Sequence, residues 1–128
     1  MNPKISVVML GVQDFNRAKQ FYGDGLGCPV AQEYPGFVSF NLGEGSSTLA
    51  LYPWEAAADE AGMAPEGNGF RGVSLHYLVD SQARVDEVLG QAEQAGGTIV
   101  KPGRQAQWGG YFGYFSDPDG YLWKVASA

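Results

Sequence analysis

Histidine and cysteine are scarce in this chain, with one of each among its 128 residues. The single cysteine, Cys28, cannot form an intrachain disulfide, which indicates a reducing compartment, and we expect the protein in the cytoplasm. Catalytic metal sites generally need three or more His, carboxylate or thiolate donors. With His76 as the one histidine, only carboxylates could complete such a site.

Long apolar runs and an excess of basic residues are also missing. No stretch approaches the length of a membrane span, and the N-terminus lacks the apolar segment of a signal peptide. Eight Lys and Arg residues stand against fourteen Asp and Glu, which gives a net charge of −6. This balance argues against nucleic acid and anionic membrane surfaces as partners. No Gly-rich motif follows a strand and opens a helix, so a nucleotide site is not expected.

The chain does contain enough apolar residues for one folded core. It is 45% hydrophobic and 13% aromatic, which is typical of a globular chain, and its length fits a single domain over residues 1–128. The patterns predict two similar halves, each with a strand, a helix and three further strands. The expected parts are a first βαβββ module at 4–53, a linker at 54–71 and a second βαβββ module at 72–127.

Hydrophobic periodicity and capping residues place the elements within each half. The first half has a predicted strand at 4–12, a helix from 14 to 22 with Asp14 as N-cap, and strands at 29–34, 36–42 and 47–53. The second half has a predicted strand at 72–79, a helix from Ser81 to Gly96 and Gly97, and strands at 98–101, 110–116 and 120–126. We expect the linker to begin with a helical turn and to become a loop from Gly62.

The last two strands form a predicted hairpin, because an Asp-Pro-Asp-Gly turn separates two aromatic runs within residues 111–124. Pro118 presets its own φ, Gly120 tolerates a positive φ, and the carboxylates of Asp117 and Asp119 can accept hydrogen bonds from local N–H groups. The turn explains both aspartates, so they resemble a catalytic pair only superficially. The sequence leaves the hairpin register open, so either Phe112 and Tyr114 or Tyr111 and Phe115 share the face of Lys124.

Several segments, taken in order and spacing, resemble the vicinal oxygen chelate superfamily, which includes glyoxalase I, extradiol dioxygenases and the bleomycin resistance proteins. The segments that carry the resemblance are the strand from Ile5, the helix at 13–22, Gly25-Leu26-Gly27, the strand at 72–80 and Asp117-Pro118-Asp119-Gly120. The resemblance implies an α+β fold in which two tandem βαβββ modules form an incomplete barrel around a cleft, with the helices outside. It also implies a homodimer.

Metal-dependent members of the superfamily are similar to one another at inward-facing His or Glu positions. The corresponding positions here are Val7, Ala50, Ser74 and Lys124. Val and Ala offer no lone pair, Ser is a poor ligand, and a protonated Lys repels a cation. The comparison therefore predicts no metal ligand and no cofactor, as in metal-free, bleomycin-resistance-like members.

Strand alternation then indicates which side chains face the cleft. If Ser74 faces inward, so do His76 and Leu78, and by the same rule Met9 goes with Val7. His76 is interpreted as a structural histidine, as a ligand contact or acid–base group, or, least plausibly, as a metal ligand. Lys124 is interpreted as a residue that reaches the rim or pairs with a carboxylate, or as an anchor for an anionic or carbonyl-bearing ligand. Schiff-base chemistry at Lys124 is a remote third option.

Aromatic residues complete the candidate site. Two glycines follow Trp108, so Trp108 and Tyr111 form an aromatic edge that could close over a flat ligand, although Trp108 could equally cover the end of the sheet. Trp54 is a weaker candidate of the same kind. The predicted ligand-binding residues are His76, Lys124, Ser74, Met9, Trp108, Tyr111 and Trp54, with no catalytic residue assigned.

Two functions of different classes stay open. The first is a metal-free module that binds and sequesters a small, partly aromatic molecule. The second is an enzyme of the superfamily, such as a glyoxalase I-like lyase, an isomerase or a dioxygenase, that is metal-dependent or uses His76 and Lys124.

Overall fold

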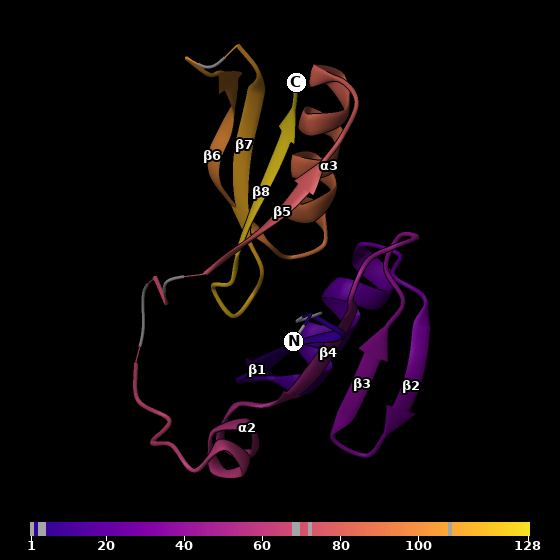
Figure 1. Ribbon diagram of the computed structural model, residues 1–128, viewed down its shortest axis with the longest axis vertical. Helices are drawn as coiled ribbons and strands as arrows, with labels where there is room; N and C mark the ends of the chain where they lie inside the picture. Colours follow the sequence, from indigo (N-terminus) through magenta and orange to yellow (C-terminus); the bar gives the residue numbers. More distant parts are fainter. Residues whose placement is uncertain (1, 3–4, 68–69, 72, 108) are drawn as a thin grey trace. The chain divides into compact units, whose positions relative to one another are not determined.

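The chain folds as two successive modules, each of which contains a strand, a helix and three further strands in that order (Figure 1). The computed structural model describes residues 2, 5–67, 70–71, 73–107 and 109–128. Two compact units divide the chain at Met1–Glu66 and Gly67–Ala128. No helix in the described residues is long and apolar enough to cross a membrane.

Each unit contributes one sheet and its own helices. The elements of the first unit are β1 (Val7–Val12), α1 (Phe15–Gln20), the π-helical turn η1 (Phe21–Gly25), β2 (Val30–Tyr34), β3 (Phe37–Phe40), β4 (Thr48–Pro53) and α2 (Trp54–Ala61). Those of the second unit are β5 (Ser74–Leu78), α3 (Gln82–Gln94), β6 (Thr98–Gln105), β7 (Tyr111–Ser116) and β8 (Leu122–Ser127).

The two sheets have the same topology. Each is an open four-stranded sheet, with the orders β1-β4-β3-β2 and β5-β8-β7-β6. In each, the first strand pairs in parallel with the last, and the other neighbours are antiparallel. The predicted α+β class with two tandem βαβββ modules is confirmed. The incomplete barrel with its cleft depends on how the modules are placed against each other, and it stays a prediction.

The first sheet packs one face on α1 and η1. Asp14 caps α1, because its carboxylate accepts a hydrogen bond from the backbone N–H of Arg17 at 3.0 Å. Phe21 and Tyr22 are fully buried and meet edge to face with ring centroids 4.9 Å apart. Phe40 of β3 completes this aromatic core, with its centroid 6.3 Å from that of Tyr22.

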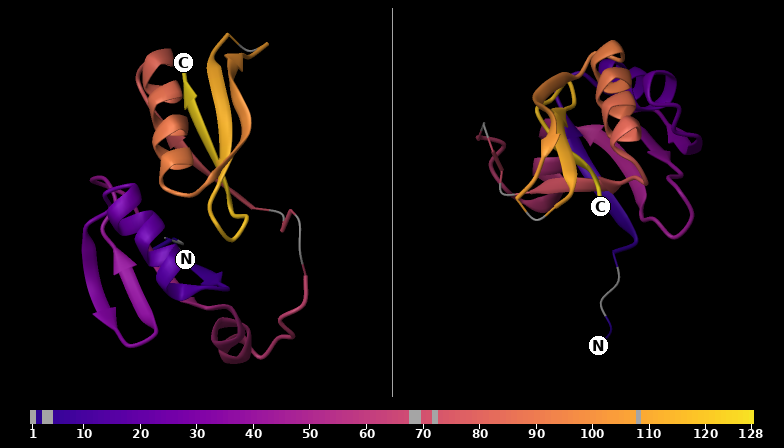
Figure 2. Two further views of the ribbon diagram at one scale, coloured as in Figure 1. Left: turned by 180° about the vertical axis from the view of Figure 1, so that it is seen from behind. Right: turned by 90° about the horizontal axis from the view of Figure 1, so that it is seen from above.

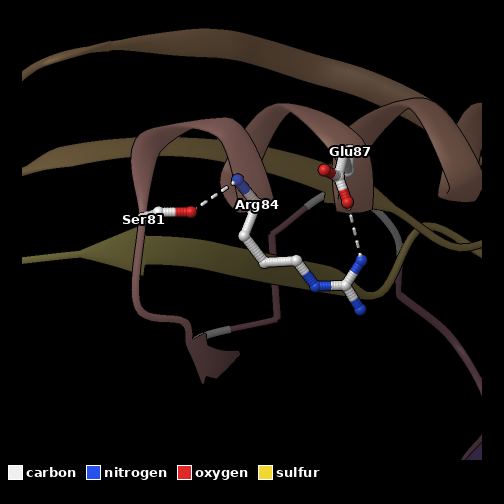
Figure 3. Close-up of polar contacts among 3 residues, drawn as sticks. All are labelled: Ser81, Arg84 and Glu87. Atoms are coloured by element: carbon white, nitrogen blue, oxygen red, sulfur yellow. Dashed lines mark hydrogen bonds and ion pairs between the residues drawn. The ribbon is translucent and has the colours of Figure 1, made fainter.

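The second sheet packs one face on α3, which contacts β6, β7 and β8 (Figure 2). Ser81, where the helix was predicted to start, caps α3. Its hydroxyl accepts a hydrogen bond from the Arg84 N–H at 3.1 Å, and the Arg84 guanidinium lies 3.2 Å from Glu87 (Figure 3). Val85, Val88, Leu89 and Ala92 face the sheet and are buried. Gly113 leaves room for this contact, since a Cβ there would lie 2.6 Å from Cδ1 of Leu89.

The structure differs from the sequence prediction at three places. The predicted helix at 14–22 changes to π-helical hydrogen bonding at Phe21 and continues to Gly25. The predicted helical turn at the start of the linker is an eight-residue helix, α2, which ends where Gly62 adopts the left-handed conformation. β6 continues past residue 101 to Gln105, because two bulges let it keep pairing with β7.

Candidate functional site

The face of the second sheet opposite α3 carries the polar candidates. Residues that pair directly across neighbouring strands share a face of the sheet. His76 pairs with Lys124, and Tyr114 pairs with Lys124 from the other side. Phe112 pairs with Arg104 on β6 and with Ala126 on β8, so it lies on the same face. We call this surface, made by Ser74, His76, Arg104, Phe112, Tyr114 and Lys124, the open face of the second sheet.

The hairpin register decides which aromatic residues lie on this face. Phe112 and Tyr114 lie there, with ring centroids 6.1 Å apart in an edge-to-face arrangement. Phe115 lies on the α3 side, where it is buried and stacks on Trp123 with centroids 5.8 Å apart. A shift of the register by one residue would have placed Tyr111 and Phe115 on the open face in place of Phe112 and Tyr114.

Lys124 lies half-buried in the middle of the open face. Its Nζ atom is 5.0 Å from the centroid of the Phe112 ring, within the range of a cation–π interaction. The ring therefore compensates part of the cost of partly burying an ammonium group. The ammonium group can also donate hydrogen bonds to an anion or a carbonyl.

His76 is exposed and is held by a neighbour on its own strand. Its Nε2 atom lies 3.0 Å from Oγ of Ser74, which is two residues earlier on β5. This hydrogen bond orients the imidazole, and the register places His76 next to Lys124 on the adjacent strand. The pair can bind a polar group, and an oriented imidazole can also transfer a proton.

Arg104 also belongs to the open face, which the sequence analysis missed. The Cζ atom of its guanidinium lies 5.9 Å from the centroid of the Phe112 ring. Pro102 and Gly103 interrupt the apolar pattern of the strand, and the predicted strand therefore stopped at residue 101. A basic residue two positions after Pro102 was the signal that the strand could continue and carry a charged side chain.

Tyr111 is separate from the open face. Its hydroxyl donates to the Asp86 carboxylate on α3, at 2.9 Å and 3.2 Å from the two oxygens. This hydrogen bond, with smaller contributions from burial and from the charge of Asp86, raises the pKa of the Tyr111 phenol. The structure therefore does not bring Tyr111 together with His76 and Lys124.

The remaining predicted residues lie in the first unit or outside the described chain. Met9 and Val7 are exposed on the face of the first sheet opposite α1, and Met9 pairs with Ala50. Trp54 begins α2 and lies against Gly11, and its Nε1–H donates to the carbonyl of Pro65 at 2.6 Å. Trp108 lies outside the described residues.

The positions at which the resemblance implies metal ligands do not offer a suitable set of donors. Val7 and Ala50 lack donor atoms, and Lys124 places an ammonium group where a ligand would be needed. Within the described part of the chain, no group of three or more His, Cys, Asp or Glu could hold a metal ion.

The surroundings of Asp117 and Cys28 explain both residues by their part in the fold. The buried Asp117 carboxylate accepts hydrogen bonds from the N–H groups of Asp119 and Tyr121, both at 2.9 Å, which closes the hairpin turn. Burial raises the pKa of the Cys28 thiol, so the reactive thiolate is disfavoured.

The family of the chain follows from comparison with known proteins. The sequence model of the Glyoxalase/Bleomycin resistance protein/Dioxygenase superfamily matches residues 4–125. The chain belongs to this superfamily. No curated protein matches the sequence of this chain.

Solved structures have the same fold as this superfamily member. A glyoxalase-related enzyme from Fulvimarina pelagi is 25% identical with a TM-score of 0.88, over 98% of this chain and 88% of that one. A glyoxalase/bleomycin resistance protein/dioxygenase family enzyme from Burkholderia phytofirmans is 21% identical with a TM-score of 0.85, over 98% of both chains. A lactoylglutathione lyase from Agrobacterium tumefaciens is 23% identical with a TM-score of 0.70, over 100% of this chain and 96% of that one. The latter two likenesses concern the fold alone.

Proposed function

We propose that this superfamily member is a metal-free, bleomycin-resistance-like protein that binds and sequesters a small, partly aromatic molecule with an anionic or carbonyl group. The observation that carries the proposal is the position of Lys124, whose ammonium group lies over Phe112 on the open face of the second sheet. Aromatic side chains beside a few placed polar groups are a common feature of small-molecule sites.

The neighbours of Lys124 support both halves of this ligand description. Phe112 and Tyr114 offer ring surface for an aromatic or apolar portion. Lys124 offers positive charge and donors, and His76 offers a second polar contact that Ser74 orients. Contacts of the ligand with Met9, Trp54 and Trp108 remain predictions, as does the homodimer.

Substitution of Lys124 tests the proposal most simply, with benzoate as an aromatic anion and benzylamine as its cationic counterpart. Wild-type protein should bind benzoate more tightly than benzylamine, as measured by titration calorimetry. Lys124→Met should weaken benzoate about tenfold, because a hydrogen bond to a charged group is lost. Arg84→Met, which removes the same charge from α3 on the other side of the sheet, should leave benzoate affinity unchanged. Equal affinity in wild type and Lys124→Met would remove Lys124 from the site.

A second candidate function is a metal-free enzyme of the superfamily, an isomerase or lyase. The observation that favours it is the hydrogen bond between Ser74 and His76, which fixes an imidazole beside Lys124. In such an enzyme His76 would move a proton next to a carbonyl, and Lys124 would stabilise the developing negative charge on its oxygen. His76→Ala should then lose turnover while it retains ligand affinity, whereas a binding module has no turnover to lose.

A further inference from the structure

Basic residues are concentrated in the second sheet of this acidic protein. Strands β5, β6, β7 and β8 contain His76, Lys101, Arg104 and Lys124 but no Asp or Glu. The strands of the first sheet contain no Lys, Arg or His, and one acid, Glu33, which forms an ion pair with Lys19 of α1. The net charge of −6 therefore comes from residues outside the second sheet, and its strands are locally basic.

These basic residues lie on one face rather than on both. Lys124 and His76 pair with each other across β8 and β5, and Lys101 pairs with Tyr114, which pairs in turn with Lys124. Arg104 pairs with Phe112, two residues before Tyr114 on β7. On the α3 side, the strands carry no charged residue, and Tyr111 donates there to Asp86 of the helix.

Arg104 and Lys124 come from the two strands that flank Phe112. Strand β7 lies between β6 and β8, so the guanidinium approaches the Phe112 ring from one neighbouring strand and the ammonium group from the other. Their distances to the ring centroid are 5.9 Å and 5.0 Å. Both cations are therefore within reach of a ligand that lies near Phe112, and a ligand with two anionic groups would pair with both.

We infer that the ligand of this site is a dianion built on a small flat frame, and that Arg104 determines this specificity. One anionic group is bound by Lys124 and the other by Arg104, with Phe112 beneath the part that joins them. A guanidinium suits this role because it presents a planar pair of donors to a carboxylate or phosphate. The inference rests on the proposed function, since it assigns a charge class to the ligand of the same face.

The test compares an aromatic dicarboxylate, terephthalate, with the monocarboxylate benzoate by titration calorimetry. Wild-type protein should bind terephthalate at least about fivefold more tightly than benzoate, because each partly exposed ion pair contributes modestly. In Arg104→Gln the ratio of the terephthalate and benzoate affinities should fall to about one. Arg104→Lys should retain part of the preference, and Arg84→Gln on α3 should retain all of it.

The outcomes separate this inference from the proposal on which it rests. If benzoate binds through Lys124 but terephthalate shows no preference, or if Arg104→Gln keeps the preference, the dianion assignment is wrong and the binding module stands. If neither anion binds, the proposed function fails as well. A wild-type preference that added sodium chloride does not reduce would also overturn the inference, since ion pairs at a partly exposed face are screened by salt.

Discussion

Lys124 shows at the level of one residue how the sheet accommodates a charge among aromatic side chains. Its ammonium group lies over Phe112, and a contact of this kind contributes about 0.5–1 kcal/mol at exposed sites and more when water is excluded. An ammonium group carries three donors, so its contact with a ring is compatible with hydrogen bonds to other groups. The cation–π contact therefore helps the fold to tolerate a half-buried lysine.

Tyr111 provides a prediction at the residue scale, on the pH dependence of one phenol. The hydrogen bond to Asp86 raises the pKa of Tyr111 above its usual value of 10.0. A raised pKa in the folded state means that the hydrogen bond stabilises the fold below the unfolded pKa and that this contribution is lost as the pH rises through the folded pKa. A spectrophotometric titration should show one phenol that ionises at a higher pH than an ordinary tyrosine.

Two variants assign that late titration. In Tyr111→Phe the phenol that ionises at high pH should be absent, and in Asp86→Ala that phenol should ionise at a lower pH. A late phenol that persists in Tyr111→Phe would belong to another tyrosine and would contradict the assignment.

Close packing of a helix on a sheet is the feature that matters at the scale of elements. Gly113 of β7 lies beneath Leu89 of α3, and a Cβ at this position would lie 2.8 Å from the carbonyl oxygen of Lys101. Gly90, on the same helix, has nothing within 4 Å of the equivalent Cβ position. The two glycines therefore respond in opposite ways to the same substitution.

Gly113→Ala should lower the free energy of unfolding by about 1–3 kcal/mol, because the added methyl group forces α3 and β6 to move. Gly90→Ala should raise the free energy of unfolding by about 0.5–1 kcal/mol, since alanine favours the helix interior over glycine. Urea unfolding of both variants against wild type measures the difference. An unchanged Gly113→Ala variant would mean that α3 does not pack on β7 as closely as described.

At the scale of the whole molecule, the sequence predicted the repeated strand and helix order because both halves share the same hydrophobic periodicity and capping residues. Asp14 and Ser81 each begin a helix at the expected place. The resemblance implied that Ser74 and Lys124 face inward, and strand alternation then added His76 to the face of Ser74. The pairing of His76 with Lys124 agrees with that placement.

The parts that sequence could not predict depend on pairing between strands. The five residues between Ser116 and Leu122 set the hairpin register, and that register put Phe112 rather than Tyr111 beside Lys124. Arg104 reaches the open face because bulges in β6 restore its pairing after Pro102 and Gly103. The hairpin register and the bulges of β6 do not produce a hydrophobic periodicity, so the sequence pattern does not predict them.

The central claim is that a small anion binds on the open face of the second sheet, and amide chemical shift mapping with benzoate tests it most directly. We predict that the largest shifts fall on β5, β7 and β8 around His76, Phe112 and Lys124, and that Lys124→Met needs about ten times more benzoate to reach the same shifts. Shifts confined to α3 or to the first unit, or the same benzoate dependence of the shifts in Lys124→Met as in wild type, would contradict the claim.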